Sequence, residues 1–262
     1  CEHTGLRYPD SVQDLIGKPV QELIGGKDVV FHGMGREDID VRCLGSGRPF
    51  VIEVREPVNR TVDFEKMEEV VNNAAKGSVE VLRCRSSTRK EVVRVKESDA
   101  EKSYEIRFKI SNKKPIIQEN ALVIPDKKKG KRRRGRHQKH VRKDVEEEED
   151  KVDLKEEEKE PLPDLPDLTE TLAALSGVDI EQRTPERVQH RRADRIRKRK
   201  VVNIDIKQIE DDEVVLVLRT QSGTYVKEFV HGDKGRTQPS VAASLGRACD
   251  VVELDVIEVH SD

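Results

Sequence analysis

Residues 33–60 read GMGREDIDVRCLGSGRPFVIEVREPVNR, and no other stretch of the chain says more about its fold and chemistry. Three carboxylic acids, Glu37, Asp38 and Asp40, lie among arginines and glycines. A positive charge nearby favours the ionised form of a carboxyl group, and an ionised carboxylate can act as a nucleophile. Arginine is also a frequent partner of phosphate groups. The stretch therefore indicates acid chemistry on a phosphate-bearing substrate.

Charge is strongly segregated along the 262 residues. The net charge is only −2, but residues 127–143 contain eleven lysines and arginines, and residues 144–160 contain eleven aspartates and glutamates. With 34% hydrophobic and 39% charged residues, the chain can form a core, but not over its whole length. We therefore predict a disordered, charged insertion over residues 124–177.

Cysteine usage and hydropathy narrow the class of protein. The four cysteines form no C-x-x-C pair, which argues against a zinc ribbon or a disulfide scaffold and favours a reducing compartment, the nucleus or the cytoplasm. No apolar run approaches the roughly 18 residues that would span a membrane, so no membrane partner is expected. The chain opens on Cys1 rather than Met, and we expect it to be part of a longer protein.

Two predicted strands flank the loop that contains the carboxylic acids. Residues 29–34 and 50–55 are rich in β-branched and aromatic side chains, as strands are. A helix is predicted after the N-cap Asp63, because apolar residues recur at helical spacing until Gly77. Residues 78–84 alternate between apolar and polar side chains in the manner of a strand.

Further elements follow beyond residue 100 without a steady βαβ repeat, so the predicted fold class is α+β. Tyr104, Ile106, Phe108 and Ile110 alternate with polar residues, which indicates a half-buried strand. The other predicted elements are strands at 201–208, 213–220 and 251–259, and short helices at 168–176 and 239–247.

A second motif near the C-terminus makes the first one specific. Residues 220–240 read TQSGTYVKEFVHGDKGRTQPS. A short Gly-Arg-x-Asp match alone is weak, since most such matches are ordinary turns. Together the two motifs resemble those of the archaeal and eukaryotic tRNA pseudouridine synthases that modify uridines 54 and 55 of the TΨC arm. The resemblance covers residues 29–123 and 178–260.

The resemblance implies a fold and a domain organisation. The expected fold is the pseudouridine synthase α+β domain, a mixed, mostly antiparallel sheet in two halves with a central active-site cleft. An upstream RNA-binding module, usual in the family, is not visible in this sequence. The expected segments are a lead-in at 1–28, the first half of the catalytic domain at 29–123, the insertion at 124–177, and a basic arm with the second half at 178–262.

The resemblance also implies three catalytic residues and neither metal nor organic cofactor. By its place in the motif, Asp38 is the catalytic aspartate, with Asp40 as the rival two residues on. Tyr104 would stack on the uracil, and Lys227 would pair with the aspartate. The alternatives are a turn carboxylate for Asp38, a core aromatic for Tyr104 and an exposed strand lysine for Lys227. His32 and His231, which flank the motifs, are assigned no catalytic role.

Candidate substrate-binding residues surround the motifs. Arg36 is expected to hold the flipped base out of the stack, and a plain phosphate contact or an ion pair with Glu37 is an equal alternative. The basic segment 183–200 is expected to form a hairpin or arm that binds RNA phosphates, unless it serves only as a nuclear-import signal. The full set of expected substrate-binding residues is Arg36, Arg42, Arg48, Tyr225, Arg191, Arg192 and Arg195.

The expected partner is tRNA, with other structured RNA as a further possibility, and the expected oligomeric state is a monomer. Two rival classes are considered. The first is a catalytically silent RNA-binding protein with the same fold, which would have lost the three catalytic residues. The second is a metal-dependent nuclease that uses Glu37, Asp38 and Asp40. Metal sites usually draw ligands from several segments, and the sequence offers no second cluster in an ordered context.

Overall fold

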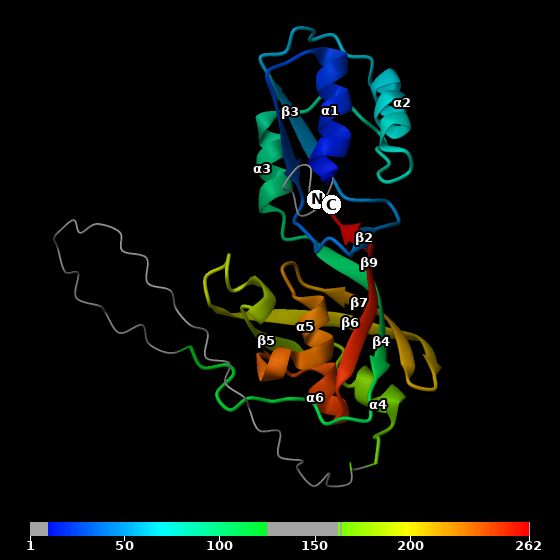
Figure 1. The fold of residues 1–262 in the computed structure, drawn as a ribbon, viewed down its shortest axis with the longest axis vertical. Coiled ribbons are helices and arrows are strands. Elements are labelled where there is room, and N and C mark those ends of the chain that lie inside the picture. The colour runs from blue at the N-terminus through cyan, green and yellow to red at the C-terminus, as the bar shows by residue number, and fades with distance from the viewer. Residues whose placement is uncertain (1–9, 125–161, 163, 262) are drawn as a thin grey trace, which may run out of the picture.

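The computed structural model describes residues 10–124, 162 and 164–261. Figure 1 shows two units joined end to end: a small helical unit built from residues 12–97, and a larger unit built around a long twisted sheet from residue 101 onward. The loop between β1 and β3 reaches from the small unit to the edge of the large sheet. The fold therefore brings the sequence motif to the junction of the two units.

The small unit is a three-layer arrangement around one antiparallel strand pair. Its elements are α1 (Val12–Ile24), β1 (Asp28–Gly33), β3 (Phe50–Arg55), α2 (Phe64–Ala75) and α3 (Arg89–Glu97). α1 and α2 pack on one face of the pair, around Ile16, Val20, Val71 and Val81. α3 packs against both strands, and its buried Val95 belongs to the main core together with Val51 of β3. Since neighbouring strand residues point to opposite faces, α3 covers the face opposite α1 and α2.

Local sequence explains part of this unit. The predicted strands 29–34 and 50–55 are confirmed as β1 and β3. The predicted helix is confirmed as α2, and the side chain of Asp63 accepts a hydrogen bond from the backbone N–H of Lys66. The strand predicted at 78–84 is wrong. Both backbone groups of Val81 are instead bonded by the amide side chain of Asn72, which takes the place of a neighbouring strand.

The large unit contains a seven-stranded sheet in the order β2-β9-β4-β7-β6-β5-β8. Only the short pair β2–β9 is parallel, so the prediction of an α+β fold with a mixed, mostly antiparallel sheet is confirmed. The strands are β2 (Arg42–Cys43), β4 (Glu101–Ile110), β5 (Asp179–Arg183), β6 (Ile196–Glu210), β7 (Glu213–Thr220), β8 (Thr237–Gln238) and β9 (Cys249–His260).

The two faces of this sheet differ in polarity. On β4, Tyr104, Ile106 and Phe108 are buried, as their alternation predicted. The opposite face is charged, and Arg107 of β4 pairs there with Glu213 of β7. The apolar face is covered by the short helices α4 (Leu168–Ala173), α5 (Val226–His231) and α6 (Val241–Leu245), which bring Leu172, Phe229 and Leu245 into the core.

Part of the predicted insertion belongs to the fold. Within 124–177, the described residues 164–177 include α4, and Leu172 and Leu175 are buried in the main core. These residues therefore pack as part of the domain rather than as a charged insertion, while the short helix predicted at 168–176 is confirmed. The predicted disorder falls otherwise on residues outside those that the structure describes.

The basic segment 183–200 forms a hairpin, as predicted. β5 and β6 pair antiparallel, with Arg183 opposite Ile196, and residues 184–195 form the loop that joins them. β6 starts before the predicted residue 201, because the basic residues themselves alternate along the strand. α5 was not predicted. No helix in the described residues is long and apolar enough to cross a bilayer.

Candidate active site at the junction of the two units

The loop of residues 34–49 contains the first motif and is fixed to the large sheet at its middle. β2 lies beside β9 with Arg42 level with Asp255, and the backbone N–H of Leu44 donates to the carbonyl oxygen of Val256 at 2.7 Å. Gly45 makes this approach possible. Its φ is 65°, and a Cβ there would lie 2.1 Å from the carbonyl oxygen of Ile257. The loop can therefore bring its carboxylates to the sheet only with glycine at this point.

Asp38 is bound by an arginine from the basic hairpin. Arg187, in the short turn η1 (Glu186–Val188), donates from Nη1 to Asp38 Oδ1 at 2.7 Å. Its Nε donates to Oε1 of Glu228 at 2.6 Å, and the side chain of Glu228 is only 1% exposed. Burial disfavours the charged guanidinium, but the hydrogen bonds and negative charges of Glu228 and Asp38 together outweigh this effect and raise the pKa of Arg187. Glu228 thus orients Arg187, and Arg187 holds Asp38.

Asp40 is bound by the lysine of the second motif. Lys227 Nζ donates to Asp40 Oδ2 at 2.5 Å, and this hydrogen bond is the main reason that the pKa of Asp40 is lowered. Lys227 was expected to pair with Asp38, with an exposed strand lysine as the alternative. It lies instead in the first turn of α5, and it contacts the rival carboxylate. Each of the two aspartates therefore has its own cation from the large unit.

Glu37 forms a third ion-pair group on the inner side of the loop. Arg48 Nη2 and Lys102 Nζ both donate to Glu37 Oε1 at 2.8 Å. The side chain of Lys102 is 8% exposed and that of Arg48 is 17% exposed, so both cations are withdrawn from bulk water. Gly35 leaves room for this group, since a Cβ there would lie 2.9 Å from Lys102 Nζ.

Tyr104 lies beneath this group, two residues after Lys102 on β4. Its side chain is 3% exposed and packs in the main core. Burial, and then the charge of Glu37, raise the pKa of the Tyr104 phenol. Tyr104 was expected beside the catalytic aspartate. The structure places it next to Glu37, under the charged residues of the loop rather than on an open surface.

The other predicted substrate-binding residues differ in where their side chains lie. Arg42 points to the charged face of the sheet, where Nε donates to Asp255 Oδ1 at 2.8 Å, so it is not brought to the site. Arg36 is exposed and has no side-chain partner among the described residues. Tyr225 is half-buried beside the site, and its backbone N–H and C=O are both bonded by the side chain of Gln182.

The hairpin arginines Arg191, Arg192 and Arg195 are exposed in the β5–β6 loop, with their side chains free for solvent or ligand. Two further residues of the site, Arg187 and Glu228, were not predicted from the sequence. A signal was available for Glu228, because it directly follows Lys227 and is one of only two acidic residues in the motif of residues 220–240. Nothing local marks Arg187 among the many arginines of its segment.

The two flanking histidines have structural partners. His32 is buried and bonds to Glu53 at 3.1 Å, and His231 Nδ1 accepts from the backbone N–H of Asp233 at 3.0 Å. Within residues 10–124 and 164–261, no group of three or more His, Cys, Asp or Glu side chains is arranged to hold a metal ion. Glu37, Asp38 and Asp40 diverge toward three separate cation groups.

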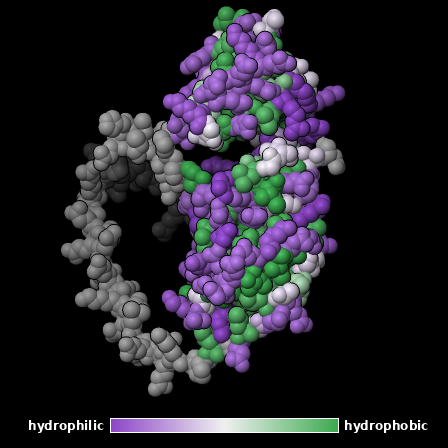
Figure 2. Space-filling view, turned by 90° about the vertical axis from the view of Figure 1, so that its right-hand side faces the viewer, coloured by the Kyte–Doolittle hydropathy of each residue, from purple (hydrophilic) through white to green (hydrophobic). Residues whose placement is uncertain are grey.

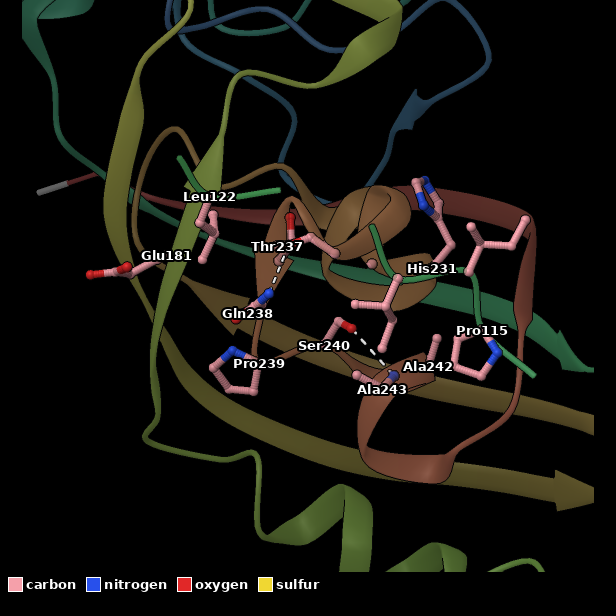
Figure 3. A pocket seen from close by; sticks show the side chains of 14 residues that line it. Pro115, Leu122, Glu181, His231, Thr237, Gln238, Pro239, Ser240, Ala242 and Ala243 are labelled. Atoms are coloured by element: carbon pink, nitrogen blue, oxygen red, sulfur yellow. Dashed lines mark hydrogen bonds between the residues drawn. The ribbon is translucent and has the colours of Figure 1, made fainter. Parts of the chain in front are cut away.

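A cavity of about 570 Å³ lies away from the aspartates, although a central cleft was expected to hold them. Figure 3 shows it between the segment containing Pro115 and Leu122 and the segment from His231 to α6. Within it, Ser240 Oγ accepts from the backbone N–H of Ala243 and caps α6. The wall is largely apolar and contains none of the three predicted catalytic residues.

Over most of its length, the chain is similar to one family of known proteins. Residues 2–132 and 159–260 match the family described as "Pus10, C-terminal". The chain is 39% identical, over 260 residues, to the tRNA pseudouridine synthase Pus10 of Methanothermobacter marburgensis, covering 99% of this chain and 52% of the relative. It is 36% identical to that of Methanocaldococcus jannaschii, covering 100% and 46%.

The chain therefore spans about half the length of the curated relatives it matches. Among solved structures, a Cbf5-Nop10-Gar1 complex overlaps 94% of this chain and 44% of the other, with 15% identity and a TM-score of 0.43. We draw no residue correspondence from that overlap.

Proposed function

The chain belongs to the Pus10 C-terminal family, and from this we propose that it is the catalytic part of a tRNA pseudouridine synthase. The proposed reaction converts uridine to pseudouridine in the TΨC arm, at position 54, position 55 or both. Reactant and product are isomers: the glycosidic C–N bond breaks, the base rotates, and a C–C bond forms. The reaction needs no redox partner.

The observation that supports this proposal is the loop with two aspartates, each held by a cation from the opposite unit. Arg187 holds Asp38 and Lys227 holds Asp40, both through contacts of 2.7 Å or less. A fixed carboxylate is what attack on a ribose or base carbon, or abstraction of a ribose proton, requires. We propose Asp38 as the catalytic group, because it occupies the aspartate position of the motif. Asp40 is the alternative.

The neighbouring residues receive roles from their positions. Exposed Arg36 is proposed to hold the flipped base, since it precedes Asp38 and has no partner of its own among the described residues. Tyr104 and the Glu37 group form the floor beneath the loop. Tyr104 can stack on a uracil only after this group shifts, because its side chain is 3% exposed. The hairpin residues Arg191, Arg192 and Arg195 are proposed to contact RNA phosphates.

The first prediction tests the choice of aspartate. Asp38→Asn is expected to abolish conversion while leaving tRNA affinity within about twofold, because the amide keeps the shape of the carboxylate but cannot act as nucleophile or base. Asp40→Asn, the matched control, is expected to retain measurable turnover. Mass-spectrometric mapping of pseudouridine in incubated tRNA gives both the activity and the position. Activity in Asp38→Asn together with inactivity in Asp40→Asn would reverse the assignment.

The same assay separates the rival classes. A synthase forms pseudouridine without added magnesium, whereas a metal-dependent nuclease shortens the RNA only when the metal is present. A silent RNA-binding protein would bind tRNA and leave its uridines unchanged. Divergence of the three carboxylates toward separate cations disfavours the nuclease. A monomer in a nuclear or cytoplasmic compartment stays a prediction.

A further inference from the structure

α3 turns one strongly basic face to solvent. At 3.6 residues per turn, Arg89, Lys90, Arg94 and Lys96 fall on one side of this nine-residue helix, together with exposed Val93 and Glu97. Val95 lies on the other side. Val95 is 4% exposed and anchors the helix to the core, while the four basic residues are exposed. We refer to these four residues as the α3 basic face.

The α3 basic face is not neutralised by the protein. None of its four side chains makes a salt bridge or hydrogen bond to another described residue. Arg89 affects Glu53 only through its charge, without a hydrogen bond. The pKa of Glu53 is lowered mainly by its hydrogen bond with His32, and Arg89 makes the smallest contribution. The helix contains two acids: Glu91 is bound by Arg85 at 2.5 Å, and exposed Glu97 lies on the same side as the four basic residues without forming an ion pair with any of them. Four unpaired positive charges against the single negative charge of Glu97 therefore leave this side of the helix net positive for an external anion.

The other side of the small unit has the opposite sign. α1 and α2 pack on the far face of the strand pair from α3, and together they contain five acidic residues and two lysines. These residues are Asp14, Glu22, Glu65, Glu68 and Glu69, with Lys18 and Lys66. Figure 2, which views the molecule from the α2 side of Figure 1, shows the hydrophilic surface of this side. A polyanion is therefore attracted to α3 and repelled by α1 and α2.

α3 is also directly connected to the candidate site. It ends at Glu97, and β4 with Lys102 and Tyr104 begins at Glu101. In Figure 1, α3 and the β5–β6 hairpin lie on the same side of the molecule, one in each unit, with the loop of residues 34–49 at the junction between the units. An RNA whose uridine reaches Asp38 extends in both directions from that nucleotide, and a basic surface lies in each of the two units.

We propose that the α3 basic face binds the phosphate backbone of the RNA substrate, so that the substrate spans both units. The proposal rests on the proposed function for the identity of the RNA. Lysine and arginine contacts to phosphate supply affinity and register, and they do not read sequence. The α3 basic face accordingly strengthens binding without selecting the uridine.

The test compares two variants that each lose three positive charges from the small unit. The first is Arg89→Ala/Lys90→Ala/Arg94→Ala, and the control is Lys18→Ala/Lys27→Ala/Lys66→Ala on the α1 and α2 side. Fluorescence anisotropy with a labelled tRNA transcript gives Kd over a salt series. If each contact contributes roughly 0.7–0.9 to the slope of log affinity against log salt, the α3 variant loses about 2–3 units of slope. Its Kd rises roughly tenfold or more at low salt.

The control variant is expected to keep the slope and Kd of the parent chain, and thermal melts show that both variants are folded. An α3 variant that binds like the control overturns the inference, and so does a parent chain that binds no tRNA. Displacement of tRNA by poly-glutamate at equal charge concentration also overturns it, because the surface would then take any polyanion. Pseudouridine formation is measured separately. Intact, α3-dependent binding without product would refute the proposed function alone.

Discussion

At the scale of single residues, the arrangement of Asp38 and Asp40 decides what the loop can do. The two carboxylates are two residues apart, yet they bind different cations, Arg187 and Lys227. Arg187 is itself fixed by the buried Glu228, so its guanidinium has one preferred direction. Lysine is a point charge on a flexible stem, and its contact with the exposed Asp40 is more easily replaced. This difference supports Asp38 as the better-positioned group.

Lys227→Met is predicted to weaken the fold only while Asp40 is ionised. The pKa of Asp40 is lowered in the folded state by Lys227. The pair therefore stabilises the fold above the ordinary carboxyl pKa of about 3.9, and the stabilisation is lost as pH falls through the lowered value. Because Asp40 is largely exposed, the expected loss is about 0.2–1 kcal/mol at pH 7.

Urea unfolding of the parent chain and the Lys227→Met variant at pH 7 and pH 3 measures this difference. It should shrink at the lower pH. Lys66→Met, on the exposed side of α2, is the control and should show no pH-dependent difference. A loss from Lys227→Met of equal size at both pH values would show that its hydrocarbon stem, rather than its charge, stabilises the fold.

At the scale of helices and strands, the sequence predicted those features that are set by residues close together in the chain. The alternation along β4 and the Asp63 cap of α2 are local patterns, and both are confirmed. α5 was missed because Tyr225, Val226 and Phe229 favour strands, and only its packing on the sheet makes it helical. The pairings of the site join residues 149 and 187 positions apart, and no local pattern specifies which of many arginines meets Asp38.

Gly45→Ala is predicted to detach the loop from β9, whereas Gly47→Ala is not. Both glycines have positive φ, 65° and 77°, so each substitution carries a backbone strain of roughly 1–2 kcal/mol. A Cβ at Gly47 meets nothing within 4 Å, but at Gly45 it collides with the carbonyl oxygen of Ile257. Turnover should fall much further in Gly45→Ala than in Gly47→Ala, and thermal melts show that both variants are folded. Equal activity in the two variants would mean that the β2–β9 contact does not position the aspartates.

Leu172→Ala tests whether α4 belongs to the domain. Leu172 is fully buried in the main core, so the substitution should cost about 2–5 kcal/mol in the free energy of unfolding. Leu165→Ala, at an exposed position just before the helix, is the control and should change little. Denaturant unfolding of both variants decides the matter. An unchanged midpoint for Leu172→Ala would place α4 outside the cooperative fold.

At the scale of the whole molecule, two separate basic surfaces should act on one RNA. Combining the α3 substitutions with Arg191→Ala/Arg192→Ala/Arg195→Ala of the hairpin is predicted to reduce the salt slope by the sum of the two separate reductions. Effects of distant surfaces that share no contacts are usually additive. The product-formation rate at saturating tRNA should change little, since phosphate contacts bind ground and transition states alike. A combined effect no larger than either alone would mean that the surfaces do not bind the same RNA at once.

The loop of residues 34–49 belongs to the small unit by its peptide bonds and to the large unit by its ion pairs. Neither unit, transplanted into a relative, would bring a complete site with it. A chimera that takes the loop from one parent and the hairpin with α5 from another would have a complete site only if two ion pairs still form. These are the pairs of Asp38 with Arg187 and of Asp40 with Lys227. Inheritance of the two units is therefore linked, and substitutions on one side of the junction limit those that the other side can accept.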